Sequence, residues 1–332
     1  VYVRGHLCEV PFDRRTFVRT NLLSWRGKIR MLAEPLTRAG RGDESVAALF
    51  QRKFGTEAYR NLLGPMYGGI YGSDPEQMPA RHALGSLLEA ETEAHSLLRA
   101  FLQRVGRGRQ FPSATFENGL QQLPNALART YDDRVDLERA VTEIDRGEEG
   151  YRLETPSGAE DVDQVVLTVP GPEAGSLLDG LASGASALRE LTYNPFAVVS
   201  LRADVDRSGM GYQVGFDADI RTLGTTWNAA LFERDDLHTA FLGGMHDPGV
   251  LEHDDEQLGS LAAREFETVT GTPAEAFDVW RLERGFPAYD ASWDALTDLS
   301  LPDGVHIATN YAGRMGIPSR VREAAALAET LA

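Results

Sequence analysis

The chain has one cysteine, Cys8, and only two lysines, Lys28 and Lys53, among its 332 residues. A single cysteine excludes an internal disulfide framework and any zinc or iron–sulfur site built from several cysteines. No apolar run approaches the roughly 18 residues that a membrane-spanning helix needs, and no charged-then-apolar signal segment opens the chain. These absences predict a cytoplasmic protein in a reducing compartment.

The charge is strongly negative but unevenly distributed. The formal net charge is −17, which argues against nucleic acid as a partner because phosphates select basic surfaces. Residues 1–110 nevertheless carry a net charge of +6, and residues 111–332 carry −23. Cations and apolar residues alternate in the front of the basic third: Arg14, Arg15, Arg19, Arg26, Lys28 and Arg30 among Phe12, Phe17, Leu22, Leu23, Trp25, Ile29 and Met31. This pattern suits an anionic membrane surface or a carboxylated substrate, with an ordinary solvated helical face as the alternative.

Periodicity predicts that residues 1–110 form a mainly helical domain. Apolar residues recur at helical spacing over 43–63, where Gly64-Pro65 is expected to end the helix, and again over 79–105. Between the two helices, the run Tyr67-Gly68-Gly69-Ile70-Tyr71-Gly72 predicts a glycine-rich loop.

After residue 110 the pattern changes to mixed α/β. Helices are expected at 119–131 and 254–270, and strands at 135–144, 151–155, 164–169, 196–204, 223–228, 237–243 and 277–286, the last four in one antiparallel sheet. The chain closes with a strand at 305–308, a loop of small residues and a helix from Pro318 to Leu331. The expected domains are 1–110, 111–190, 191–290 and a closing strand–helix unit at 291–332.

The closing unit is the first candidate for a binding site. Pro318 suits the first position of a helix, and the loop from Asn310 to Ile317 leads directly to the exposed N–H groups there. Such a strand–loop–helix can bind a negatively charged group, although an ordinary βα connection has the same sequence pattern.

Several kinds of catalytic chemistry have no motif in this chain. There is no G-x-G-x-x-G between a strand and a helix and no G-x-S-x-G elbow. His246 and His253 lie near acidic residues but lack the helical spacing of metal ligands, so a solvated acidic loop is favoured and no metal site is predicted. No catalytic side chain is assigned.

One long stretch and several short ones carry a family resemblance. Residues 54–75 read FGTEAYRNLLGPMYGGIYGSDP and end in a Y-x-x-D-P loop. Further matches follow in the same order, at 116–123, 165–170, 223–227, 241–244, 286–289 and 310–318. Over nearly its whole length the chain resembles the oxygen-dependent protoporphyrinogen oxidases of the FAD-dependent, amine-oxidase-like superfamily.

The resemblance implies a fold and a reaction. It implies the remainder of a Rossmann-like FAD-binding domain, an antiparallel-sheet substrate domain and a helical membrane-associated domain. The family's N-terminal βαβ unit, with its G-x-G-x-x-G, is expected to lie outside this chain, which begins at Val1. The implied activity is FAD-dependent oxidation of protoporphyrinogen or coproporphyrinogen III by oxygen in haem synthesis, with possible peripheral membrane contact. The oligomeric state is not predicted.

Family position also implies site residues. Those expected at the FAD are Val141, Phe286, Tyr289, Met315, Gly316 and Ile317, and those expected at the substrate are Gly69, Gln213, Thr226 and Phe241. Val141, Phe241, Phe286 and Tyr289 could equally be core residues of strands. The polar Gln213 and Thr226 stand where the family usually has leucine-like residues, which indicates either a more polar substrate face or a shift of one residue in the match.

Two alternatives remain open from the sequence. The first is another flavin oxidase or desaturase of the superfamily, acting on amines or carotenoids. The second is a non-catalytic fragment that lacks its flavin-binding half.

Overall fold

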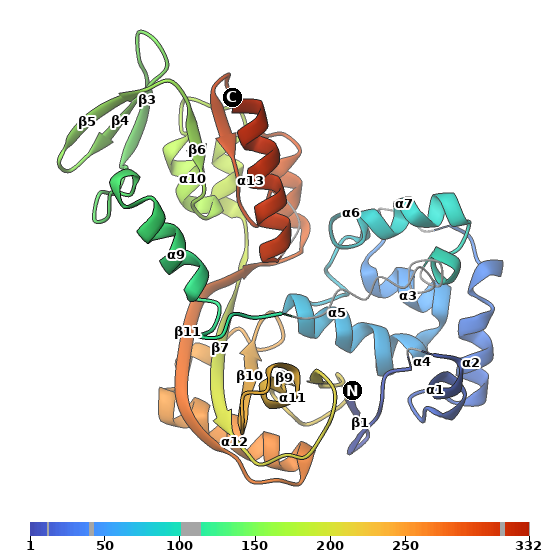
Figure 1. Ribbon diagram of the computed structural model, residues 1–332. Helices are drawn as coiled ribbons and strands as arrows, with labels where there is room; N and C mark the ends of the chain where they lie inside the picture. The colour runs from blue at the N-terminus through green and yellow to red at the C-terminus, as the bar shows by residue number, and fades with distance from the viewer. Residues whose placement is uncertain (12, 40–42, 101–113, 313–315, 332) are drawn as a thin grey trace. The chain divides into compact units, whose positions relative to one another are not determined.

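The chain divides into two compact units (Figure 1). The computed structural model describes residues 1–332 except 12, 40–42, 101–113, 313–315 and 332. The first unit comprises residues 1–114 and 193–291, and the second comprises residues 115–192 and 292–332. The segments expected as a helical domain and as an antiparallel-sheet domain thus fall together in the first unit.

The front of the first unit is mainly helical, as predicted. Its elements are β1 (Tyr2–Val3), β2 (His6–Leu7), α1 (Arg14–Arg19), α2 (Trp25–Leu32), η1 (Glu34–Leu36), α3 (Val46–Phe54), α4 (Thr56–Ala58), η2 (Tyr59–Leu63), α5 (Gly64–Tyr71), α6 (Ala80–Ala83) and α7 (Gly85–Ala94). Side-chain caps start several of these helices: Asp13 forms a capping box at α1, and Ser24 and Ser45 accept from backbone N–H groups of α2 and α3. No helix of the described residues is long and apolar enough to cross a membrane.

The glycine-rich loop expected at 67–72 is wrong, because residues 67–71 are the second half of α5 and Gly72 ends the helix in the left-handed conformation. The helical path also continues through Gly64-Pro65 instead of ending there. The glycines make close packing possible: a Cβ on Gly64 would lie 2.7 Å from the Phe216 ring, and one on Gly72 would lie 1.9 Å from the Phe196 ring. Tertiary packing therefore outweighs the poor helix propensity of glycine.

A charged cluster is buried in the helical part. Lys53, Glu34 and Glu91 have side chains that are at most 3 % exposed. Lys53 Nζ lies 2.8 Å from Glu34 Oε1 and also donates to Glu91. Glu34 accepts further from the Leu97 and Leu98 N–H groups at 3.0 and 3.2 Å. Burial opposes ionisation of Glu34, but hydrogen bonds from Lys53, Ser96 and Leu98 outweigh it and hold the Glu34 pKa below its ordinary value.

The rest of the first unit is a five-stranded antiparallel sheet in the order β11-β7-β10-β9-β8, which confirms the single antiparallel sheet that the sequence predicts. Its elements are β7 (Tyr193–Arg202), β8 (Gly211–Gln213), β9 (Thr222–Thr226), α11 (Asn228–Phe232), β10 (Leu237–Gly243), η5 (Val250–Glu252), α12 (Asp255–Thr270) and β11 (Glu275–Pro287). In Figure 1, β7 and β11 are long neighbouring strands.

One face of this sheet is the hydrophobic core. Ala197, Val199 and Leu201 alternate along β7 and are completely buried, and they belong to one cluster with Leu258, Ala262 and Phe266 of α12. A capping box at Asp254 starts α12, and Gly271 ends it in the left-handed conformation. We call the opposite face, which α12 does not cover, the open face.

The second unit combines helices with two small sheets. Its elements are α9 (Gln122–Thr130), η3 (Asp132–Arg134), β3 (Glu143–Arg146), β4 (Tyr151–Thr155), β5 (Gly158–Val162), β6 (Val165–Leu167), α10 (Gly171–Leu177), η4 (Ala185–Glu190), η6 (Ala291–Leu296, starting at the boundary), β12 (Val305–Ile307) and α13 (Ile317–Leu331). Strands β3, β4 and β5 form an antiparallel sheet, and β6 pairs with β12 in parallel. The expected strand at 135–144 is wrong over most of its length, since β3 begins at Glu143.

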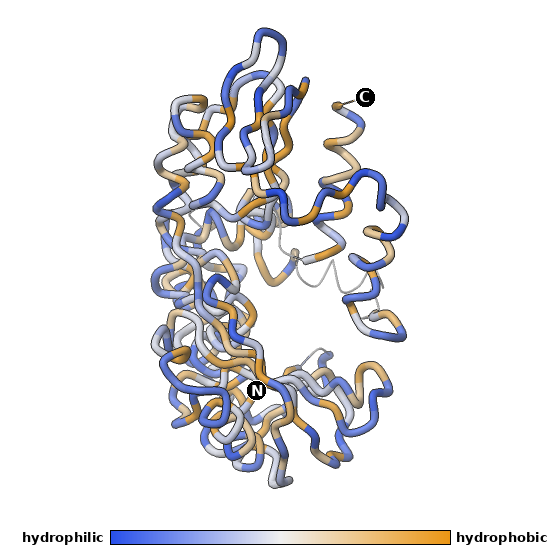
Figure 2. The backbone as a smooth tube through the Cα atoms, turned by 90° about the vertical axis from the view of Figure 1, so that its left-hand side faces the viewer, coloured by the Kyte–Doolittle hydropathy of each residue, from blue (hydrophilic) through white to orange (hydrophobic). Residues whose placement is uncertain are grey.

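The helices of the second unit expose apolar side chains. Neither α9 nor α13 has a buried residue. Leu127 of α9 is 51 % exposed, and Val321 of α13 is 58 % exposed. Figure 2 shows orange segments along the helix that ends at the C-terminus.

Candidate functional site

The register places three of the four expected substrate residues on the open face. Gln213 of β8 pairs with Gly224 of β9, and Gly224 pairs with Phe241 of β10. Thr226 lies two residues beyond Gly224 on the same strand, so it points to the same side. All three side chains are partly exposed.

The fourth expected residue, Gly69, lies on α5 directly against Gln213. A Cβ on Gly69 would lie 1.8 Å from Gln213 Oε1, and a Cβ on Gly224 would lie 2.9 Å from the same atom. The amide thus occupies space that two glycines leave free. Gln213 Oε1 is buried and has no hydrogen-bond partner among the described residues. An unsatisfied buried acceptor costs about 1–3 kcal/mol. Gln213 lies in one cross-strand row with Gly224 and Phe241.

A row of hydroxyl groups runs next to Phe241 on the open face, and sequence reasoning found only one member of it. Thr226 pairs with Thr239 on β10, Thr239 pairs with Ser200 on β7, and Ser200 pairs with Asp278 on β11. Asn228 Nδ2 donates to Thr239 Oγ1 at 2.7 Å, which leaves the Thr239 hydroxyl proton available for another acceptor. Only the strand register, which short-range patterns do not reveal, shows that these hydroxyls are neighbours.

An aromatic row lies between the hydroxyl row and the end of the sheet that α5 covers. Phe241 pairs with Val198 on β7, and Val198 pairs with Trp280 on β11. Trp280 is 62 % exposed. The pairing shifts after Phe241 on β10 and between Leu282 and Phe286 on β11. Such bulges bend a strand and re-aim side chains, and they are frequent beside binding sites.

The two aromatic residues expected beside a flavin, Phe286 and Tyr289, lie at and just beyond the end of β11. The Phe286 ring meets Phe196 edge to face at 5.2 Å between centroids, and the Tyr289 ring meets Tyr71 at 4.8 Å. Burial raises the pKa of the Tyr71 phenol, so this group stays protonated at neutral pH. Each of these residues belongs to the first unit.

The strand–loop–helix of the second unit holds the other expected flavin residues. Met315 lies outside the described residues. Gly316 precedes α13 with φ at +97°, a conformation that favours glycine, and a Cβ there would meet only Pro318 Cδ at 3.9 Å. Pro318 is the second helical residue, not the first as predicted. Val141 lies two residues before β3, in the part of the unit that forms the antiparallel sheet.

The residues at this helix start fit the electron-rich edge of a flavin. Loop and helix follow the carboxyl end of β12, where α/β folds bind their ligands. The Ser319 and Arg320 N–H groups donate to Gly316 O, and Pro318 has none, so Gly316 and Ile317 supply the other backbone donors at this end. Thr309 Oγ1 is buried without a hydrogen-bond partner in the described part of the chain. Donors at a positively polarised helix end suit developing negative charge.

Only part of the basic cluster in the front of the chain is free to contact a membrane or a substrate. Lys28 is 6 % exposed and donates to Val18 O at 2.7 Å, and Arg30 donates to Lys53 O at 2.8 Å. Leu22 and Leu23 are buried as well. The interpretation of Lys28, Leu22 and Leu23 as surface groups is therefore wrong, and Arg30 is half-buried.

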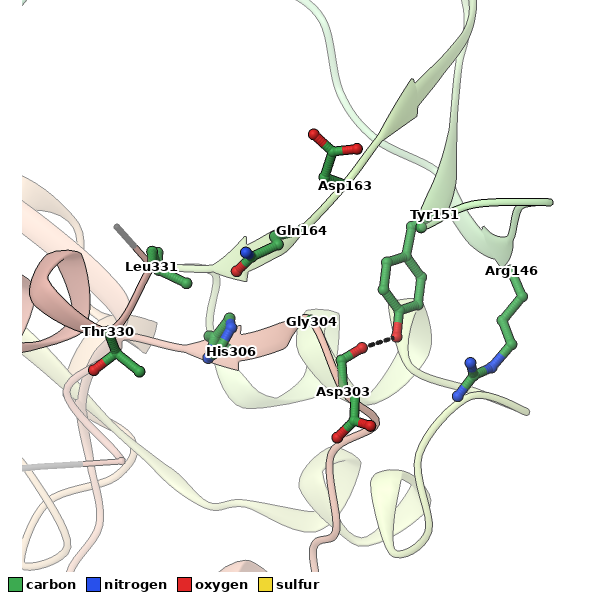
Figure 3. A pocket seen from close by; sticks show the side chains of 10 residues that line it. Arg146, Tyr151, Asp163, Gln164, Asp303, Gly304, His306, Thr330 and Leu331 are labelled. Carbon is green, nitrogen blue, oxygen red and sulfur yellow. Dashed lines mark hydrogen bonds between the residues drawn. The ribbon is translucent and has the colours of Figure 1, made fainter.

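A pocket of about 480 Å³ lies in the second unit (Figure 3). Asp163, Gln164, Asp303 and Gly304 line it at the amino ends of β6 and β12. Tyr151 Oη donates to Asp303 O at 2.6 Å across its wall. None of the expected site residues lines this pocket, which lies at the opposite end of the two strands from Gly316.

These features together define a class of protein: a mixed α/β fold with an antiparallel sheet and, in the second unit, a strand–loop–helix whose backbone donors suit a flavin. The model of the flavin containing amine oxidoreductases matches residues 1–317, and the chain belongs to this family. The expected fold class and the expected flavin cofactor are confirmed at this level. The family match does not show a membrane-associated domain.

Two curated relatives allow a closer comparison within this family. The chain is 28 % identical over 304 residues to protoporphyrinogen oxidase 1 from the chloroplast of Arabidopsis thaliana, covering 79 % of this chain and 56 % of that protein. It is 26 % identical over 316 residues to coproporphyrinogen III oxidase of Staphylococcus aureus, covering 86 % and 67 %. The chain spans just over half the length of the plant relative.

Solved structures share the fold. A crystal structure from Exiguobacterium sp. 255-15, provisionally named a protoporphyrinogen oxidase, has a TM-score of 0.76 at 24 % identity, covering 99 % of this chain and 76 % of that one. A redesigned putrescine oxidase has a TM-score of 0.63 at 14 % identity, covering 97 % and 77 %. The family match and the named relatives confirm the resemblance seen in the sequence. The solved structures support the fold alone.

Proposed function

We propose that the protein oxidises a porphyrinogen to the porphyrin with bound FAD, with oxygen as the final acceptor, in haem biosynthesis. The observation that carries this proposal is the open face, where the register brings Gln213, Thr226 and Phe241 together and α5 adds Gly69. All four are the residues that family position implies at the substrate. The names of the Arabidopsis and Staphylococcus relatives support the same substrate class.

In this proposal the chain's residues orient a flat reduced macrocycle. Phe241 and Trp280 offer aromatic surface to its pyrrole rings. The hydroxyl row of Thr226, Thr239 and Ser200 lies two residues along the strands from the aromatic row, a distance of about 7 Å by strand geometry. Its hydroxyls can donate to the substrate's carboxylates. The flavin, when bound, accepts the substrate's electrons in pairs. The backbone N–H groups of Gly316 and Ile317 stabilise negative charge at its edge.

The FAD-loaded protein is expected to make protoporphyrin or coproporphyrin III fluorescence rise faster than autoxidation of the porphyrinogen alone. Phe241→Leu removes aromatic contact worth about 0.5–1.5 kcal/mol, so KM should rise by roughly threefold to tenfold. The matched control is Phe266→Leu, since Phe266 of α12 belongs to the core cluster on the other face of the sheet. Oxidation of amines but not of porphyrinogens would favour the amine-oxidase alternative, and failure to retain FAD would favour the non-catalytic one.

We also propose that α2 contacts an anionic membrane surface. Trp25, Ile29 and Leu32 follow helical spacing along one side of α2 and are 66 %, 67 % and 57 % exposed. Lys28 ties α2 to α1 through Val18 O. The exposed cations of this pair of helices are Arg14, Arg15, Arg19 and Arg26. An apolar stripe flanked by arginines complements the charge of anionic lipid headgroups, even though the whole chain is acidic.

The membrane proposal predicts sedimentation with phosphatidylserine-containing vesicles at low salt and not with phosphatidylcholine vesicles. Ile29→Asp should weaken this binding about tenfold, because it replaces an inserted side chain worth about 1.5–3 kcal/mol. Leu137→Asp is the matched control, since Leu137 is 81 % exposed in the second unit and adds the same charge. Equal losses in both variants, or no sedimentation of the unaltered protein, would reject the membrane contact.

A further inference from the structure

Ser73 lies at a junction of three segments that are far apart in the sequence. It lies two residues after the end of α5 and is completely buried. Its hydroxyl oxygen accepts from Asn194 Nδ2 of β7 at 3.0 Å and from the Tyr289 N–H at 3.2 Å, and it donates to Tyr71 O at 3.2 Å. A serine hydroxyl offers one donor and two acceptor positions, so these bonds use all of them.

The junction connects the open face to the aromatic residues expected beside the flavin. On one side, Gly72 receives the Phe196 ring, and Phe196 meets Phe286. On the other side, the Tyr289 ring lies edge to face against Tyr71. The peptide that carries Tyr289 is fixed by Ser73, and the ring is fixed by the neighbouring Tyr71.

Two further contacts hold this junction from the β10–α12 connection. The Met245 N–H donates to Gly72 O at 2.8 Å, and the Gly244 N–H donates to Pro195 O at 2.8 Å. Gly244 has φ at +73°, and a Cβ there would lie 2.4 Å from Gly72 O. The β10–α12 connection is therefore hydrogen-bonded to the residue that precedes Ser73 and to the residue that follows Asn194.

We propose that Ser73 is a positioning residue for the reaction: it sets the orientation of Tyr289 beside the flavin and links it to the substrate face. This inference rests on the proposed function. Without the hydroxyl, Asn194 Nδ2 and the Tyr289 N–H both lose this hydrogen bond. The peptide of Tyr289 is then held less firmly in the position where its ring packs against Tyr71.

The test compares Ser73→Ala with Ser96→Ala in the FAD-loaded protein. Ser96 is the matched control because it is also completely buried and hydrogen-bonded, through its hydroxyl to Glu34, but lies in the helical part. Ser73→Ala should lower kcat for porphyrinogen about tenfold with KM within twofold and shift the visible flavin band. Ser96→Ala should change neither. Asn194→Ala, which keeps the bond to Tyr289, should have a smaller effect than Ser73→Ala.

A second readout separates this inference from the proposed function. Near-ultraviolet circular dichroism of the FAD-free protein reports the fixed tyrosine pair, and its tyrosine band should fall in Ser73→Ala and persist in Ser96→Ala. If the unaltered protein oxidises no porphyrinogen, the proposed function fails while this band still decides whether Ser73 positions Tyr289. An unchanged band together with unchanged kcat in Ser73→Ala overturns the inference. If Ser73→Ala does not fold, the same measurements on Asn194→Ala and Ser73→Thr decide it, the threonine restoring the hydroxyl.

Discussion

Replacing Lys53 by methionine should lower the free energy of unfolding of the first unit by about 3–5 kcal/mol, the cost of leaving a buried charge without its partner. Lys53 Nζ serves two carboxylates, those of Glu34 and Glu91, and all three side chains are at most 3 % exposed. Methionine fills a similar volume but supplies no charge or donor. Urea unfolding at neutral pH measures the loss.

Two features distinguish this effect from simple loss of packing. Lys28→Met is the matched control, because Lys28 is the other lysine and is also buried, but it makes one hydrogen bond to Val18 O and lies 4.9 Å from the Trp25 ring centroid. Its loss should cost about 1–2 kcal/mol. Adding Glu91→Gln to Lys53→Met should restore part of the stability, because it removes one of the two buried carboxylates that interact with Lys53. Equal losses in the two lysine variants would contradict the argument.

The pH dependence of the Lys53 effect has a definite sign. In the unaltered protein the Glu34 pKa is lowered in the folded state, so its contribution is present above its ordinary value of 4.5 and is lost as pH falls through the folded pKa. In Lys53→Met, Glu34 loses its cation, and burial, the largest influence on this carboxyl, then raises its folded pKa. The variant should therefore gain stability relative to the unaltered protein as pH falls from 8 to 5.

The strands of the sheet could be predicted because their residues are locally consistent. The run 237–243 was predicted with its observed bounds, and the expected strand at 277–286 was found at 275–287. β-Branched and aromatic residues with alternating burial produce this signal. The strand β5 was missed because its residues, GAEDV, are acidic and exposed on both sides, so no alternation marks it.

The site was less accessible to sequence reasoning than the strands. Gly69 and Gln213 are separated by 144 positions, and only family position placed both at one ligand; their contact depends on how α5 packs on the sheet. The glycines that predicted a loop instead receive the rings of Phe196 and Phe216. Likewise, the scarcity of lysine gave no hint that both lysines are buried. Such roles are decided by tertiary contacts that no local pattern records.

Gly316→Asp should abolish retention of FAD in the enzyme, because it adds a negative charge where the N–H groups of Gly316 and Ile317 are proposed to meet the flavin. Gly316 also has φ at +97°, which an L-residue with a side chain rarely adopts. The measurement is the ratio of flavin absorbance to protein absorbance after gel filtration. The expected ratio falls at least tenfold below that of the unaltered protein.

Charge and backbone conformation can be separated with a second variant. Gly316→Asn adds a side chain of nearly the same size and shares the conformational penalty, but it is neutral, and asparagine tolerates positive φ better than most residues. If the flavin edge lies at this helix start, Asn should retain a substantial part of the FAD and Asp should not. Among the described residues, a Cβ at Gly316 would meet no atom closer than Pro318 Cδ at 3.9 Å, so the first side-chain carbon fits in both variants. Equal and complete retention by both variants would remove Gly316 from the flavin site and leave the start of α13 as an ordinary βα connection.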